Sequence, residues 1–202
     1  MKKKLSPLMI CDLVLMVLLL VFSLVCVVMI FGGLKPAPPQ YSDSEKTAWY
    51  VYGAVNLVNL LALACGIVYI CKGYSKQAAG YYKAFMFLLA VASIPNIIVN
   101  ILISQGSSAI LQSLPLSIAI MVFKAAILLL LVFWKDLGRR NTWILFFVLL
   151  ILDIIYGFLF GDISGIRAFR VVTILSRLVT DGTIAIAIYG KFADKVRRGR
   201  KV

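Results

Sequence analysis

The chain has 202 residues, of which 62% are hydrophobic, and its mean hydropathy is +1.00. Soluble domains contain about 45–50% apolar residues, so this composition excludes an ordinary soluble domain and indicates a membrane protein. The formal net charge of +13 would suggest a nucleic-acid partner in a soluble protein. Here the placement of the basic residues around the apolar runs explains the charge, and no nucleic-acid partner is expected.

Six apolar runs follow one another along the chain, each near the length of about 20 residues that an α-helix needs to cross a bilayer. Continuous runs such as "AAILLLLVFW" do not alternate in polarity, which excludes a transmembrane β-barrel. The expected spans cover residues 8–31, 48–71, 84–104, 111–134, 142–160 and 168–190. We therefore predict an all-α integral membrane protein whose residues 1–202 form a single domain, a bundle of six transmembrane helices.

The distribution of lysine and arginine predicts the orientation of these spans, because cytoplasmic loops carry the excess of basic residues. Most of the basic residues fall on one side, at Lys2 to Lys4, between the second and third spans, between the fourth and fifth, and in the tail "KFADKVRRGRKV". Both termini are therefore expected to be cytoplasmic. The first span is longer than the apolar core of a signal peptide, so we expect it to remain as a helix. The basic tail is expected to contact anionic lipid headgroups, and the expected location is a bacterial cytoplasmic membrane.

Cysteine and histidine give little sign of a metal or redox site. The sequence contains no histidine, and its four cysteines form no CxxC pair. Zinc and haem sites of the usual kinds are therefore not expected. We predict no cofactor, and we expect the cysteines to act as small apolar packing residues.

Four ionisable residues lie well inside the expected spans, namely Lys124, Asp153, Arg177 and Asp181. Each would cost about 2.5–3.5 kcal/mol at the centre of a lone inserted helix, so all four are expected to face the interior of the bundle. Arg177 and Asp181 share one face of a helix at a spacing of four residues. Lys124 and Asp153 can meet only across the interface between the fourth and fifth helices.

Four asparagines add to this polar set. Asn56 and Asn59 are one turn apart in the second span, and Asn96 and Asn100 are one turn apart in the third. All four are expected in the outer half of the membrane, where they would converge with the ionisable residues on one cavity. Asp12, near the cytoplasmic end of the first span, is instead expected to reach water or the helix N-terminus.

Two functions are compatible with these residues. The first is a small-molecule or ion transport protein, or a membrane substrate-binding subunit, whose mid-membrane site binds a small polar or zwitterionic solute. The alternative is a non-transporting assembly, regulatory or immunity-type protein, in which the ion pairs serve packing against a membrane partner or a second copy. An enzyme is not expected, because serine or cysteine catalysis has no histidine base here. An intramembrane hydrolase or a lipid-modifying enzyme is the remaining alternative.

The expected architecture also resembles that of one transporter component. In its size, six helices and cytoplasmic termini, the chain is similar to the substrate-binding subunits of energy-coupling-factor vitamin transporters. The first span "CDLVLMVLLLVFSLVCVVM" contains no alanine, so the AxxxA contact motif of those subunits is missing. The resemblance is therefore one of architecture alone.

Overall fold

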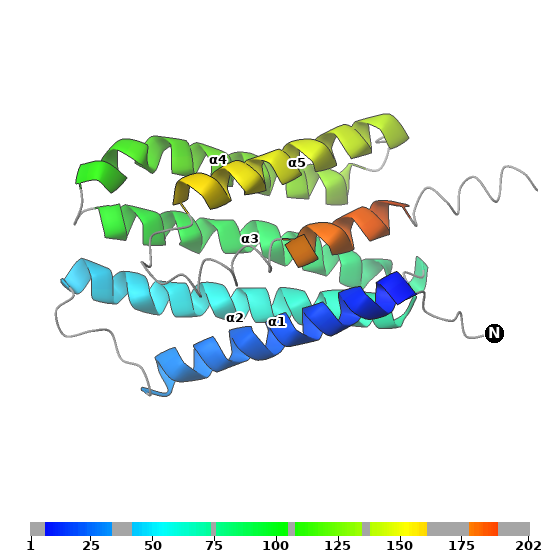
Figure 1. Ribbon diagram of the computed structural model, residues 1–202, viewed down its shortest axis with the longest axis horizontal. Helices are drawn as coiled ribbons and strands as arrows, with labels where there is room; N and C mark the ends of the chain where they lie inside the picture. Colours follow the sequence, from blue (N-terminus) through cyan, green and yellow to red (C-terminus); the bar gives the residue numbers. More distant parts are fainter. Residues whose placement is uncertain are drawn as a thin grey trace, which may run out of the picture.

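The computed structural model describes residues 7–33, 42–73, 76–104, 108–134, 138–160 and 178–189. Over these residues the chain is helical, with no strand (Figure 1). The elements are α1 (Pro7–Phe31), α2 (Asp43–Cys71), the short 3-10 helix η1 (Lys76–Ala78), α3 (Ala79–Ser104), α4 (Ser108–Phe133) and α5 (Arg139–Phe160). A further helix, here called the last helix, covers Leu178–Tyr189 and is orange in Figure 1.

Four of these helices are long and apolar enough to cross a membrane, in α1, α2, α3 and α4. The helix lengths and apolar composition therefore support the all-helical fold and a membrane location. Six spans and the orientation of the termini stay predictions. The expected sixth span is described only from Leu178 onward, and Arg177 lies outside the described residues.

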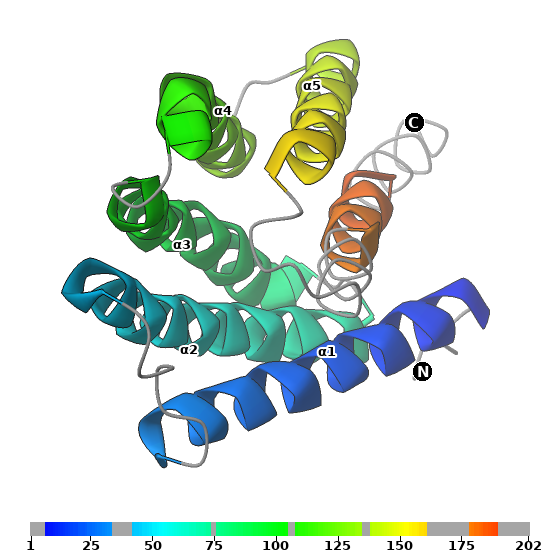
Figure 2. The ribbon, with the colours of Figure 1, turned by 60° about the vertical axis from the view of Figure 1, so that its left-hand side comes forward.

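The helices follow one another around the bundle in chain order (Figure 2). Each long helix packs on the next, from α1 on α2 through to α4 on α5. The last helix returns to α1, where the Thr183 hydroxyl lies 3.0 Å and 3.1 Å from the two carboxylate oxygens of Asp12. This contact joins residues at opposite ends of the chain, so the helices form a ring.

The core and the outer surface of this ring are both apolar. The largest fully buried side chains come from several helices and include Met16, Ile70, Phe85, Met86 and Leu149. Large aliphatic and aromatic side chains also cover the outside, with Leu18 and Ile94 each 60% exposed. A water-soluble protein rarely exposes so much contiguous apolar surface, whereas a lipid-facing surface requires it.

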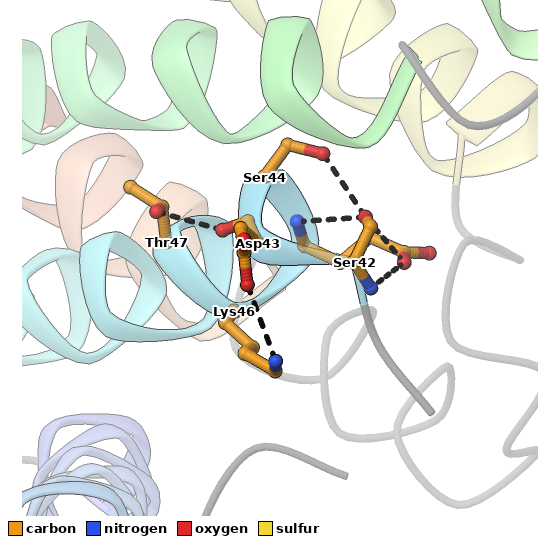
Figure 3. Close-up of polar contacts among 6 residues, drawn as sticks. Ser42, Asp43, Ser44, Lys46 and Thr47 are labelled. Atoms are coloured by element: carbon orange, nitrogen blue, oxygen red, sulfur yellow. Dashed lines mark hydrogen bonds and ion pairs between the residues drawn. The ribbon is translucent and has the colours of Figure 1, made fainter. Parts of the chain in front are cut away.

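A capping box sets the beginning of α2, which starts at Asp43 rather than at residue 48 as the hydropathy predicts. The Ser42 backbone N–H donates to Glu45 Oε2 at 2.8 Å, and the Glu45 N–H donates to Ser42 Oγ at 3.4 Å (Figure 3). Lys46 and Asp43 form an exposed ion pair at 3.3 Å beside it. These bonds satisfy backbone donors that a helix N-terminus leaves without partners, so the helix continues past its apolar region.

Glycine allows α1 and α3 to approach α2 closely. A Cβ atom at Gly66 would lie 2.4 Å from Met16 Cε and 3.2 Å from the Phe85 ring. Met16 Cε is the end of a flexible side chain and can shift, so the fully buried Phe85 ring sets the tighter limit. Gly66 therefore lies at the contact between three helices, where a larger side chain must displace Met16 and crowd the Phe85 ring.

Replacing Gly66 with valine tests this contact. We expect Gly66→Val to lower the free energy of unfolding by about 1–3 kcal/mol, the usual cost of overpacking a core. The matched control is Gly80→Val, because a Cβ at Gly80 meets nothing within 4 Å. Thermal unfolding in detergent micelles measures both variants, and equal losses of stability would contradict the close packing at Gly66.

Candidate functional site

A cavity of about 260 Å³ lies inside the ring of helices. All five long helices and the last helix contribute to its wall. Apolar side chains make up part of the lining, at Leu19, Phe22, Val55, Leu63, Leu89, Ala92, Leu128, Leu149 and Ile184. The polar lining consists of Ser23, Tyr52, Asn56, Asn59, Ser93, Asn96, Lys124, Asp153, Thr180 and Asp181.

Six of the eight residues predicted for the site line this one cavity. They are Asn56, Asn59, Asn96, Lys124, Asp153 and Asp181. They come from α2, α3, α4, α5 and the last helix, so the fold brings together groups that are far apart in the sequence. Asn100 does not line the cavity, and Arg177 is outside the described residues.

Lys124 and Asp153 form an ion pair between α4 and α5, at the interface where the sequence allows them to meet. The Asp153 side chain is buried, while the Lys124 side chain keeps 20% of its surface exposed. The Lys124 ammonium also lies 5.9 Å from the centre of the Tyr156 ring, within the range of a cation–π interaction. The ammonium therefore has a carboxylate and an aromatic face as neighbours.

Asn100 links three helices beside this ion pair. Its Nδ2 donates to Ser117 Oγ at 2.7 Å on α4 and to Tyr156 Oη at 3.1 Å on α5. All three residues are buried. Since an amide nitrogen carries two hydrogens, it can serve both hydroxyl oxygens at once. Asn100 thus fixes the ring of Tyr156, which lies one turn from Asp153 on the same face of α5.

The asparagines of the cavity wall use their amide N–H groups within their own helices. Asn56 Nδ2 donates to the Tyr52 carbonyl at 2.9 Å, and Asn96 Nδ2 donates to the Ala92 carbonyl at 3.1 Å. A backbone carbonyl can only accept, so the atom that faces it must be the amide nitrogen. The amide oxygen therefore points away from that carbonyl, and the lining gains hydrogen-bond acceptors.

Ser93 behaves in the same way as these asparagines. Its hydroxyl donates to the Leu89 carbonyl at 3.4 Å, within α3. Two carboxylates, those of Asp153 and Asp181, complete the acceptor groups of the wall, and both are buried. Among the described residues the lining therefore combines these acceptors with one ammonium group and with the hydroxyl and amide groups of Ser23, Tyr52, Asn59 and Thr180.

Of the two positions predicted for Asp12, the contact with water is wrong. Asp12 is only 8% exposed, and it contacts the Thr183 hydroxyl instead of reaching water. The same hydroxyl lies 3.0 Å from the Val179 carbonyl, so its single proton serves one acceptor at a time. The Thr183 hydroxyl of the last helix thus takes the place of the water that was expected at the Asp12 carboxylate.

Two residues of the cavity wall were not anticipated from the sequence. Tyr52 lies near the beginning of the second apolar run, and Ser23 lies within an almost wholly apolar run; both line the cavity. The signal that could have identified Ser23 is its place as a polar residue in the middle of an apolar span. The structure shows that it is buried. The sequence carries no comparable signal for Tyr52.

Metal ligands are not grouped in the part of the chain that the structure describes. No set of three or more cysteine, aspartate or glutamate side chains there is arranged to hold an ion. The cavity instead offers amides, hydroxyls, carboxylates and an ammonium, which are the groups of a polar binding site. Comparisons with protein-family models, curated proteins and solved structures find no match to this chain.

A double-mutant cycle tests the energetics of the ion pair. Removing one partner of a buried pair costs up to about 3–5 kcal/mol, because the other charge stays buried. We expect a smaller loss here, since the Lys124 side chain is 20% exposed. Asp153→Leu should therefore destabilise the protein more than Lys124→Met combined with Asp153→Leu, as measured by thermal unfolding in lipid nanodiscs. Additive losses in the double variant would show that the two charges do not interact.

Proposed function

We propose that this protein is a membrane transport protein, or a membrane substrate-binding subunit, and that the cavity binds a small polar or zwitterionic solute. The observation that carries the proposal is a polar cavity inside a bundle whose outer surface is apolar. Intramembrane ionisable residues often mark the pathways of solutes and ions. Here two carboxylates and an ammonium share one cavity with three asparagines.

The presence of a void favours binding over packing. Protein interiors are close-packed, and an ion pair that serves only to hold helices together needs no space beside it. The cavity of about 260 Å³ equals the liquid volume of about eight or nine water molecules. It is slightly below the range of about 300–1,000 Å³ for pockets of drug-sized ligands, so it suits a solute of a few heavy atoms.

One observation favours the alternative function, in which the protein is a non-transporting assembly, regulatory or immunity-type partner. Lys124 and Asp153 contact each other directly, so this pair of charges is neutralised without a ligand. In that case the exposed apolar faces of the helices would bind a membrane partner or a second copy of the chain. The two functions differ in whether water and solutes reach the cavity.

Cysteine accessibility distinguishes the two functions. In a variant whose four native cysteines are replaced by alanine, we expect Ser93→Cys to react rapidly with a small, charged, membrane-impermeant thiosulfonate. Ser93 lines the cavity, and a thiol needs water to form the reactive thiolate. The rate of labelling is measured with the reagent added to each side of sealed vesicles in turn.

The adjacent residue supplies the matched control. Ile94 is 60% exposed on the outside of the bundle and is absent from the cavity wall, so Ile94→Cys should face hydrocarbon and react slowly. Equally slow labelling of both variants from both sides would contradict the proposed function and support the packing alternative.

A further inference from the structure

We propose that Asp153 and Tyr156 form a subsite for the ammonium group of an amine solute, and that Lys124 fills this subsite when no solute is bound. The inference rests on the proposed function, because it names the class of solute that the same cavity binds. It also assigns a role to Tyr156, whose ring lies beside the Lys124 ammonium although the residue is not part of the cavity lining.

The geometry around Lys124 shows that these residues can bind an ammonium. The Asp153 carboxylate pairs with the Lys124 ammonium, and the Tyr156 ring centre lies 5.9 Å from it. A carboxylate gives a charge-assisted hydrogen bond, and an aromatic face attracts a cation more strongly when both are shielded from water. Asp153 and Tyr156 are both buried. The side chain of Lys124 thus acts as a tethered alkylammonium.

The subsite is held in place by contacts that do not involve Lys124. The Tyr156 hydroxyl accepts from Asn100 at 3.1 Å, and Asn100 also donates to Ser117 at 2.7 Å. These bonds connect α3, α4 and α5 and fix the aromatic ring. Because a binding site works best when its groups are preorganised, the ring and the carboxylate can receive another ammonium once Lys124 moves aside.

Lys124 is suited to such an exchange. Its ammonium is carried on a flexible four-carbon stem, and the side chain keeps 20% of its surface exposed. Asn56 and Asn96 contribute acceptors to the lining, because they use their N–H groups within their own helices. A solute with an ammonium group complements these acceptors better than an anion does.

Chemical rescue tests the subsite in the full-length protein in lipid nanodiscs. Lys124→Ala removes the tethered ammonium and the three carbons beyond Cβ, and the adjoining cavity gives room for the additional carbon of n-butylammonium, which has the length of the whole lysine side chain. We expect n-butylammonium to raise the melting temperature of Lys124→Ala in a saturable manner, by about 2–4 °C at concentrations several times its Kd. Butanol and butyrate, which match its size without the positive charge, should have no such effect.

Two further variants show which residues bind the ammonium. The rescue should disappear in Lys124→Ala combined with Asp153→Asn, and it should weaken in Lys124→Ala combined with Tyr156→Leu. Lys124→Met offers a second route if the alanine variant does not fold, since methionine refills the space of the stem. Methylammonium should then stabilise Lys124→Met. Failure of both amines, or equal stabilisation by butanol, would overturn the subsite.

Comparing n-butylamine with 4-aminobutyrate shows whether the solute that provides the ammonium is a simple amine or a zwitterion. A zwitterion can place its ammonium at Asp153 and its carboxylate at Lys124, so a zwitterionic solute should stabilise the wild-type protein. A simple amine must displace Lys124 without replacing its partner, so it should act mainly on Lys124→Ala. Rapid labelling of Ser93→Cys without any response to amines would refute the ammonium subsite and leave the proposed function standing.

Discussion

Lys124 and Asp153 place opposite charges inside a bundle that presents apolar side chains on its outer faces. Neither charge is tolerable alone in such surroundings, so α4 and α5 must pack in the register that joins them. Asn100 bonds the Tyr156 hydroxyl, the Tyr156 ring lies beside the Lys124 ammonium, and both charges line the cavity. The position of the polar wall within the bundle thus depends on this interaction.

The ring of helices explains why the interior contains space. Neighbouring helices pack in chain order, and the ring closes where Thr183 of the last helix contacts Asp12 of α1. Gly66 allows α1, α2 and α3 to pack closely on one side, while each of the long helices and the last helix contributes polar residues to the cavity wall. Polar groups keep water or a solute in a cavity, whereas a purely apolar cavity of this kind stays empty. In the proposed function, the bound solute fills the cavity between the polar side chains of the wall.

Hydropathy indicated where the described helices lie, and four of them are long and apolar enough to cross a membrane, because length and apolar content are local properties of the chain. The sequence also indicated that Lys124 and Asp153 can meet between α4 and α5, and they do so, because a charged side chain inside a membrane bundle needs a partner.

The predictions that failed concern where a side chain points and which residues it contacts. Asn100 is one turn from Asn96 on α3, yet it meets Ser117 and Tyr156 rather than the cavity. Asp12 meets a hydroxyl from the other end of the chain. Such partners depend on how the helices are rotated and assembled, which hydropathy does not encode. The role predicted for Arg177 stays a prediction.

The central claim is that the cavity holds a polar solute inside the membrane. A high-resolution density map of the protein in a lipid nanodisc, recorded with and without 4-aminobutyrate, tests it most directly. The account predicts ordered water in the cavity without the solute and, with it, density for the zwitterion between Lys124 and Asp153. A map in which the helices close over this space, with the two side chains sealed together under both conditions, would contradict the account.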